Sequence, residues 1–313
     1  AALTAGLDEM IPAVTLDLQC GSALESITAA AAKIESGLAD LVIAGGFESS
    51  STQPVRMWNS NHPDYQEGKS YTVAKFIPDI QGEQVMLEGA EKTALTENVT
   101  KAEMDPWVLL SHKRAAQAAK EGILSDIQFS IADSKKDEGI RPSMSQRLLA
   151  RLPCLLPGGS IITAANACLM HDGAAFVVLC SEAYRKKHGL TPQAAFRFGT
   201  AIGSDPFMSP KTAVLAIRKL LKQTALSIDE IYSLEVNEAF AVIDVLLERE
   251  FPGIRERLNP LGGALAYGHP YGASGAIILL HLLKDLELNQ GRFGICGVAA
   301  AGGIGTALLV EKV

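Results

Sequence analysis

The sequence has few aromatic residues, few cysteines, little positive charge and no long apolar run. Aromatic residues make up 6% of the chain, five cysteines occur among 313 residues, and the formal net charge at pH 7 is −7. Five cysteines are too few for a disulfide-built scaffold, so we expect reduced thiols and a cytoplasmic location. The net negative charge argues against nucleic-acid and membrane-surface partners, because binding to phosphates requires a basic face. No apolar run approaches the roughly 18 residues of a membrane-spanning helix.

Small apolar residues dominate what is present. Hydrophobic residues make up 48% of the chain, and 28 residues are glycine. This composition indicates a large core in which backbones approach one another closely. A length of 313 residues fits two domains or one duplicated architecture. The chain starts with AALTAGLDEM, which is typical of the tail of a helix, and we expect the first part of the domain to be missing from this numbering.

The first 50 residues alternate between strand-like and helix-like patterns. Apolar residues alternate with polar or small ones over 14–18, which predicts a strand. Apolar residues three or four positions apart over 24–34 predict a helix that Gly37 ends. The apolar run at 41–46 predicts a second strand. A strand, a helix and a strand in this order predict a βαβ unit within a buried, parallel sheet.

The composition changes in the middle of the chain and then returns. Residues 52–151 are richer in turns and charges and poorer in strand signal, which predicts an inserted excursion. Within it, we expect a helix to begin at Asp105 and Pro106, because proline is favoured in the first turn of a helix. A helix predicted over 274–288 precedes strands rich in glycine and alanine. This layout repeats that of the first unit and predicts an internal duplication.

Cys20 lies between the first predicted strand and the first predicted helix. Backbone N–H groups and the helix dipole favour an anion at such a position, so we expect a thiol with a lowered pKa. The alternative is a buried structural cysteine, because cysteine is among the most buried residue types. The position alone leaves both interpretations open.

Two further polar residues stand out, and both come after buried or glycine-rich segments. His269 lies in GGALAYGHPYGASGA, where glycines let the backbone turn tightly and approach a ligand. This setting is unusual for a core-filling histidine and favours a functional role. Asn237 follows the apolar segment SLEV, where α/β sheets often place site residues. A helix cap is the alternative for Asn237.

The glycine-rich segment CGVAAAGGIG does not predict a nucleotide-binding loop. It lacks the G-x-G-x-x-G spacing and is followed by the strand-like TALLVEKV rather than by a helix. The cysteines and histidines also lack the spacing of a zinc site, so we predict no bound metal.

Several of these segments together resemble the thiolase family, which comprises acetyl-CoA acetyltransferases and 3-ketoacyl-CoA thiolases. They are QCGSAL, VNEAFA, GHPYGASGA and GGIGTALLVEK, with NACLMHDGAA similar to the family's NAS-x-x-NDGAA segment and SHKRAAQAAKEG similar to its loop-domain helix. The resemblance covers nearly the whole chain. It implies an α/β fold of duplicated αβαβα layers with an inserted loop domain, and a homodimer or homotetramer.

The resemblance also implies a division of the chain. It divides into an incomplete N-terminal thiolase half at 1–51, a loop domain over the coenzyme A site at 52–169, a return to the N-terminal half at 170–190 and a C-terminal half at 191–313. No cofactor would be bound permanently, and coenzyme A thioesters would be the substrates.

The same resemblance implies roles for individual residues. Cys20 would be the nucleophile that takes the acyl group from coenzyme A. His269 would deprotonate it and donate to the thioester oxyanion, and Asn237 would position a water that completes the oxyanion hole. Arg141 matches an arginine against the adenine end of coenzyme A, and Phe240 matches a residue lining the pantetheine tunnel.

The sequence departs from the family pattern in three places. The second catalytic cysteine of C-x-G-G-G-x-G falls on Ala299, and the first glycine of the triplet falls on Ala301. A family serine that contacts coenzyme A corresponds to Cys168. The strand and helix that open the family domain are absent before AALTAGL. Cys296 is a possible second acid/base, although its odd offset from Ala299 would place it on the opposite face of a strand.

The resemblance therefore implies a thiolase-type acyltransferase of fatty acid metabolism that works by a ping-pong mechanism. In the family, the second cysteine removes the α-proton of the attacking acetyl-CoA. We expect its replacement by Ala299 to spare acylation of Cys20 and to weaken condensation and thiolysis, since a positioned acid/base is worth typically about 10²–10⁴-fold. A decarboxylating, ketosynthase-like condensing enzyme and a non-catalytic acyl-CoA-binding protein remain the alternatives.

An acidic protein that binds anionic coenzyme A must supply positive charge locally. The candidates in the excursion are Lys113, Arg114, Lys135, Lys136 and Arg141. A solvated, charged surface is the competing interpretation for most of them.

Overall fold

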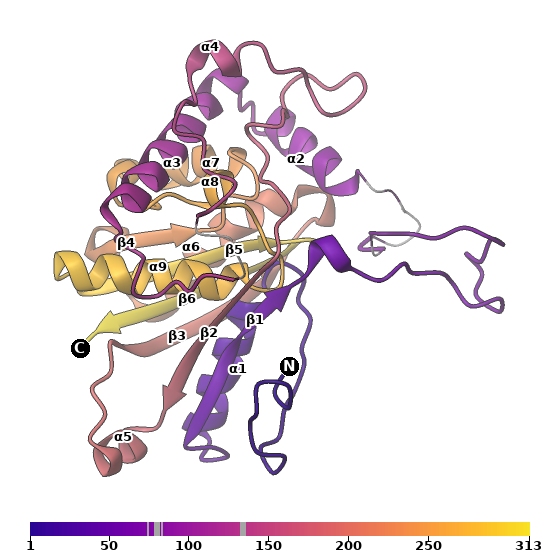
Figure 1. The fold of residues 1–313 in the computed structure, drawn as a ribbon. Helices are drawn as coiled ribbons and strands as arrows, with labels where there is room; N and C mark the ends of the chain where they lie inside the picture. Colours follow the sequence, from indigo (N-terminus) through magenta and orange to yellow (C-terminus); the bar gives the residue numbers. More distant parts are fainter. Residues whose placement is uncertain (74, 78–81, 83, 132–135) are drawn as a thin grey trace.

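Two β-sheets with two helices between them form the centre of the molecule (Figure 1). This computed structural model describes residues 1–73, 75–77, 82, 84–131 and 136–313. The smaller sheet pairs β1 and β2 antiparallel, and the larger sheet has the order β3-β6-β5-β4. The strands are β1 (Leu41–Glu48), β2 (Gly173–Cys180), β3 (Ala194–Gly203), β4 (Ile231–Val236), β5 (Phe293–Ala300) and β6 (Ile304–Lys312).

The helices belong to three groups. The central pair is α1 (Ser22–Glu35) and α9 (Ser274–Asn289). The predicted excursion contains α2 (Val85–Thr96), α3 (Lys101–Glu121) and α4 (Gln146–Leu149). The others are α5 (Glu182–His188), α6 (Thr212–Thr224), α7 (Val242–Glu250) and α8 (Ala264–Tyr267), with 3₁₀ turns at Ser50–Thr52, Pro206–Lys211, Ile228–Glu230 and Arg255–Arg257.

The elements stack in four layers. Helices α1 and α9 contact both sheets, and α6 covers the other face of the larger sheet with α7 beside it. The described residues thus form β, α, β and α layers, and the predicted α/β architecture is confirmed. The outer face of the smaller sheet is exposed, with Ile43, Phe47 and Val178 each more than half accessible.

Two predictions about strands are wrong. Residues 14–18 form no strand and make only an isolated bridge between Leu18 and Cys20, because within the described part of the chain no extended segment pairs alongside them. The strand at β1 is confirmed, but it pairs antiparallel with β2 rather than within a parallel sheet. An apolar run predicts a buried strand without identifying its partner. Parallel pairing occurs between β4 and β5.

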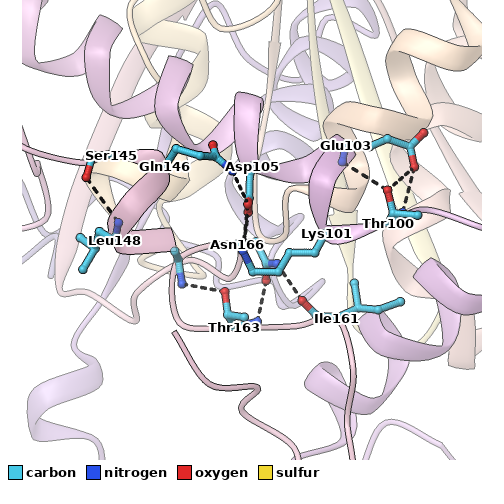
Figure 2. A network of polar contacts seen from close by, with 11 residues as sticks. Thr100, Lys101, Glu103, Asp105, Ser145, Gln146, Leu148, Ile161, Thr163 and Asn166 are labelled. Atoms are coloured by element: carbon cyan, nitrogen blue, oxygen red, sulfur yellow. Dashed lines mark hydrogen bonds and ion pairs between the residues drawn. The ribbon is translucent and has the colours of Figure 1, made fainter. Parts of the chain in front are cut away.

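The helix predictions are confirmed for the central pair and wrong at the start of α3. Helix α1 ends just before Gly37, which has a left-handed φ of 74°. Helix α3 begins at Lys101 instead of Asp105, because Thr100 and Glu103 form a capping box that satisfies two N-terminal donors (Figure 2). Pro106 therefore lies inside the helix.

The two central helices touch at their N-terminal ends. A Cβ atom built on Gly275, in the first turn of α9, would lie 2.5 Å from the backbone nitrogen of Leu24 in α1. A side chain of any size at Gly275 would separate the helices. This contact brings together the two turns that precede α1 and α9, which carry Cys20 and His269. No described helix is long and apolar enough to cross a lipid bilayer.

Candidate active site

Cys20 is held in a tight turn immediately before α1. Gln19 adopts a left-handed φ of 55°, which is uncommon for a residue with a side chain. The Ser22 hydroxyl stabilises this turn, since it accepts from the Leu18 N–H at 2.9 Å and donates to the Gln19 carbonyl at 2.6 Å. Cys20 is buried, with 8% of its surface exposed. Its thiol is thus fixed at the N-terminal end of a helix.

His269 occupies the equivalent turn before α9. Gly268, with φ 90°, packs so tightly against the ring of His171 that a Cβ would lie 2.5 Å from it. The backbone N–H of His269 donates to the Leu169 carbonyl at 2.7 Å. The imidazole is 1% exposed. The loop therefore holds the ring rigidly in the interior.

The hydrogen bonds around His269 assign its tautomer. The Ser274 hydroxyl lies 3.0 Å from the Pro270 carbonyl, which can only accept, and 2.6 Å from Nδ1 of His269. Ser274 donates to the carbonyl, so it accepts from Nδ1–H. Nε2 then carries the lone pair, and it lies 3.3 Å from Nδ2 of Asn237. Asn237 is confirmed to follow a strand, β4, and its Oδ1 is buried with no hydrogen-bond partner among the described residues.

Tyr271 connects the histidine with the cysteine. Its ring lies edge-on to the His269 ring, with centroids 4.9 Å apart. Burial raises the pKa of the Tyr271 phenol, and nearby charges on Cys168, Cys20 and Glu48 raise it further. Cys20, Cys168, Tyr271 and His269 therefore share one region, at the meeting point of α1 and α9.

The electrostatics of the two central groups differ from the sequence-based expectation. Burial raises the pKa of Cys20 to about 12, against a smaller lowering by a hydrogen bond from the backbone of Ala301. The expectation of a lowered pKa is wrong because the loss of solvation outweighs the helix terminus. Burial also lowers the pKa of His269 to about 3. The resting site holds a neutral thiol and a neutral imidazole.

The segment 166–170 joins the loops that carry Asn237 and His269. The Ala241 N–H donates to the Asn166 carbonyl, and the Cys168 N–H donates to the Ala239 carbonyl at 3.0 Å. The Leu169 carbonyl, in the same segment, accepts a hydrogen bond from the His269 N–H. Cys168 is therefore part of the site, and Phe240 is buried beside it through a bridge to Ala167.

Arg141 lies further out, in the excursion. Its side chain is exposed and donates to the Glu138 carbonyl, while its backbone N–H donates to His112 Nδ1 at 3.2 Å. The nearby Gly139 packs against the backbone of Ala266, where a Cβ would lie 2.4 Å from the carbonyl oxygen. The Arg141 loop therefore borders the loop that leads to His269.

Cys296 belongs to the same apolar cluster as Cys20 but lies on the other face of β5 from Ala299. It lies fully buried on the face of β5 that packs towards the central helices, together with Val298 and Ala300. Ala299 faces the opposite side and belongs to the apolar cluster that contains Ala167, Ala239 and Phe240. The structure thus places Cys296 and Ala299 on opposite faces of the strand.

The remaining cationic candidates have different surroundings. Arg114 is engaged structurally, since it donates to the carbonyls of Leu258 and Arg255 and forms an ion pair with Glu256. Lys113 is exposed on α3. Lys135 lies outside the described residues, and Lys136 has an interaction partner.

Sequence reasoning missed three residues of the site. Ser274 had a usable signal, because a serine in the first turn of a helix five positions after a histidine can reach its ring. Tyr271 stands between two motif residues, and no pattern in the sequence distinguishes it. Glu238 is buried and accepts from Ser111 at 2.7 Å and from the Leu265 N–H at 3.3 Å, which ties α3 and α8 to the Asn237 loop.

Two other buried carboxyl groups belong to the elements on either side of Asn237 in the sequence, β4 and α7. Glu235 on β4 and Asp244 on α7 are fully buried, and within the part of the chain that the structure describes neither carboxyl group has a hydrogen-bond partner. Burial and neighbouring acids raise both pKa values well above their usual range. The described residues contain no group of three or more histidine, cysteine, aspartate or glutamate side chains that could hold a metal ion.

The paired sheets, the central helices and the turns that carry Cys20 and His269 define a thiolase fold. The structure superimposes on the human mitochondrial 3-ketoacyl-CoA thiolase crystallised with CoA, with a TM-score of 0.91 and 30% identity over 100% of this chain and 81% of that one. It matches the Bacillus anthracis acetyl-CoA acetyltransferase equally well, with a TM-score of 0.91 and 31% identity over 100% and 82% of the two chains.

The sequence comparisons agree with the fold. The family "Thiolase, N-terminal domain" matches residues 1–183 and "Thiolase, C-terminal domain" matches 190–312. The steroid 3-ketoacyl-CoA thiolase FadA6 of Mycobacterium tuberculosis is 34% identical over 99% of this chain and 77% of its own length. The putative acetyl-CoA C-acetyltransferase YhfS of Bacillus subtilis is 34% identical over 99% and 82%. The chain belongs to the thiolase family of acyltransferases.

Proposed function

We propose that this protein transfers an acyl group from acyl-CoA to the Cys20 sulfur and then to acetyl-CoA or coenzyme A. The observation that carries the proposal is the contact between α1 and α9 at Gly275 and Leu24, which brings the Cys20 turn to the His269 turn. A nucleophile, a base and a positioned amide within one buried region are the parts that thioester exchange requires.

Acylation begins from the neutral pair. His269 takes the thiol proton at Nε2 as the sulfur attacks the thioester carbon, so the ion pair forms only during the reaction. Ser274 supports the imidazolium, because its hydroxyl oxygen already accepts from Nδ1–H. Asn237 Nδ2 and a water held by this amide stabilise the developing oxyanion, and one such donor is typically worth about 2.7–4 kcal/mol.

Coenzyme A enters along the segment 166–170. Cys168 and Phe240 lie next to its pantetheine arm, and Arg141 lies next to its adenine end. A homodimer or homotetramer and the division of the chain at 51, 169 and 190 stay predictions, as does a cytoplasmic location.

Acyl-enzyme formation is the experiment that tests this function. Wild-type protein incubated with [¹⁴C]acetyl-CoA should retain label on Cys20 after denaturation, and Cys20→Ala should retain none. Cys180→Ala is the matched control, because this half-buried cysteine is remote from the site. It ends strand β2, whereas Gly173 at the other end of that strand packs against Pro270, next to His269. Absence of label from the wild type, or equal labelling of Cys20→Ala, rejects the proposal.

A decarboxylating condensation is the second candidate, and the methyl side chain of Ala299 favours it. A carbanion formed by loss of CO₂ requires no base at that position, whereas one formed from acetyl-CoA does. Acetylated enzyme should be offered malonyl-CoA and acetyl-CoA separately. Product from malonyl-CoA alone supports the decarboxylating reaction, and product from acetyl-CoA supports thiolase chemistry. Stoichiometric acyl-CoA binding without any label on Cys20 supports a non-catalytic binding protein.

A further inference from the structure

A thiolase-type condensation requires a base for the α-carbon, and Ala299 has no titratable group. The structure offers another thiol in the same region. Cys168 lies between the loops of Asn237 and His269, since its N–H donates to Ala239 and the next carbonyl accepts from His269. These two bonds fix the backbone of Cys168 relative to both reacting elements.

The start of this segment is itself anchored. The Asn166 side chain is buried, accepts from the Thr163 N–H at 2.8 Å and donates to the Ile161 carbonyl at 2.9 Å (Figure 2). The Ala241 N–H donates to the carbonyl of the same asparagine at 2.9 Å. Catalytic groups need such support, because small displacements of a general base cost large factors in rate.

The surroundings of the Cys168 thiol connect it with the reacting sulfur. Burial, and after it a charge on Cys20, raises the pKa of Cys168, and after burial a charge on either cysteine raises the pKa of Tyr271. Cys168 also packs against the apolar cluster to which Ala299 belongs. Its residue surface is half-buried, whereas Cys20 and Cys296 are buried.

The other titratable groups fit the role less well. Cys296 is fully buried on the opposite face of β5 from Ala299. Glu48 is already engaged, since it accepts from the Gly272 N–H at 3.1 Å. The unpartnered Oδ1 of Asn237 marks a polar position in the same site where a substrate or water belongs.

We propose that the Cys168 thiol is the acid/base of carbon–carbon bond formation and cleavage, in place of the cysteine absent at Ala299. The inference rests on the proposed function. During acylation, Cys168 gives its proton to the departing coenzyme A thiolate and becomes a thiolate, while His269 holds the proton taken from Cys20.

In the second half, the Cys168 thiolate removes one α-proton from acetyl-CoA. The C–H electron pair forms the new C–C bond to the acyl carbon on Cys20, and the C–S bond breaks with its pair on sulfur. The Cys20 thiolate then recovers its proton from His269, and Cys168 is again a thiol. No oxidant, metal or further reactant is needed.

The test separates the two half-reactions in Cys168→Ala and in the near-isosteric Cys168→Ser. Because Cys168 also protonates the departing coenzyme A thiolate, we expect both variants to acetylate Cys20 about threefold to tenfold more slowly than wild type, with water supplying that proton. Condensation of two acetyl-CoA molecules should fall roughly 10²–10⁴-fold. The rate at which the acetyl-CoA methyl protons exchange with D₂O, measured by NMR, should fall by the same factor as condensation. Cys180→Ala is the matched cysteine control and should behave as wild type.

A double variant gives the strongest check. Cys168→Ser combined with Ala299→Cys moves the thiol to the other position, and it should restore condensation to within about tenfold of wild type. Condensation by Cys168→Ala at the wild-type rate overturns the inference. So does a result in which Tyr271→Phe loses methyl-proton exchange and Cys168→Ala keeps this exchange. Acetylation of Cys20 without any wild-type condensation also overturns it. Each of these results leaves the acylation half of the proposed function intact, which fails only if Cys20 is not labelled.

Discussion

Nδ2 of Asn237 lies 3.3 Å from Nε2 of His269, although 32 residues separate them. Asn237 follows strand β4, and His269 stands before helix α9. The Asn237 amide faces Nε2, which carries the lone pair of the imidazole. A group bound beside this pair can therefore give a proton to Nε2 and have its negative charge stabilised by the amide. A substrate carbonyl placed between Cys20 and this pair meets the requirements for thioester chemistry.

Replacement of Ser274 by alanine should slow acylation without unfolding the protein. Ser274 accepts from Nδ1–H of His269 at 2.6 Å and thereby selects the tautomer with its lone pair on Nε2. Because the serine acts through the histidine, we expect a rate loss of roughly 10- to 10²-fold, less than that for the base itself. Release of coenzyme A, measured with a thiol reagent, gives the rate. An unchanged rate in a variant with wild-type Tm contradicts the assignment.

Alkylation of Cys20 by iodoacetamide should be slow at neutral pH in the free enzyme. Burial raises the pKa of this thiol to about 12, so the thiolate fraction rises about tenfold for each unit between pH 7 and 10. Mass spectrometry of the labelled peptide gives the rate at each pH. A plateau below pH 8 would show a thiolate already formed in the resting site. Slow alkylation therefore does not argue against catalysis, and acyl transfer is the decisive assay.

The approach of α1 to α9 should not tolerate a methyl group. Gly275→Ala would place its Cβ 2.5 Å from the Leu24 nitrogen, and we expect a loss of about 1–3 kcal/mol in the free energy of unfolding. Gly89→Ala is the matched control, because the nearest atom to its Cβ is 3.4 Å away. That variant should gain about 0.5–1 kcal/mol from better helix propensity. Chemical denaturation measures both, and equal effects would contradict the close contact.

Glu235→Gln should change how stability depends on pH. Burial without a partner raises the pKa of Glu235 above 4.5 in the folded protein. In the wild type, the raised pKa of this carboxyl therefore contributes fully to the free energy of unfolding below pH 4.5. That contribution is lost as the pH rises through the folded-state pKa. Glutamine cannot ionise. Relative to wild type, the variant should gain free energy of unfolding as the pH rises from 4 to 8, and parallel curves in urea titrations would contradict this.

Local patterns predicted the central elements well. The boundaries of α1 and α9 follow from apolar spacing and from Gly37, and the strand before Asn237 follows from a short apolar run. These signals are local, because hydrogen bonds and side-chain faces within one element decide them. The signal that sets the start of α3 is also local. The capping box of Thr100 and Glu103 outweighs the preference of Pro106 for the first turn of a helix.

Other properties depend on neighbours that the sequence does not identify. The segment 14–18 has a strand pattern but no partner within the described residues, so it forms no strand. The pKa of Cys20 is shifted in the opposite direction from the one that its helix terminus predicts, because the apolar cluster that buries it comes from distant segments, among them β2, α9, β5 and β6. Desolvation is a sum over all of these surroundings.

The sequence by itself determined the family, the identities of the nucleophile and base candidates, and the loss of a thiol at Ala299, because motif residues and short-range periodicity are written along the chain. Only the tertiary structure decided that α1 and α9 meet at their N-terminal ends and that Cys168 lies between the loops of Asn237 and His269. Those relationships depend on long-range packing, in which glycines such as Gly275 permit a backbone contact that no side chain allows.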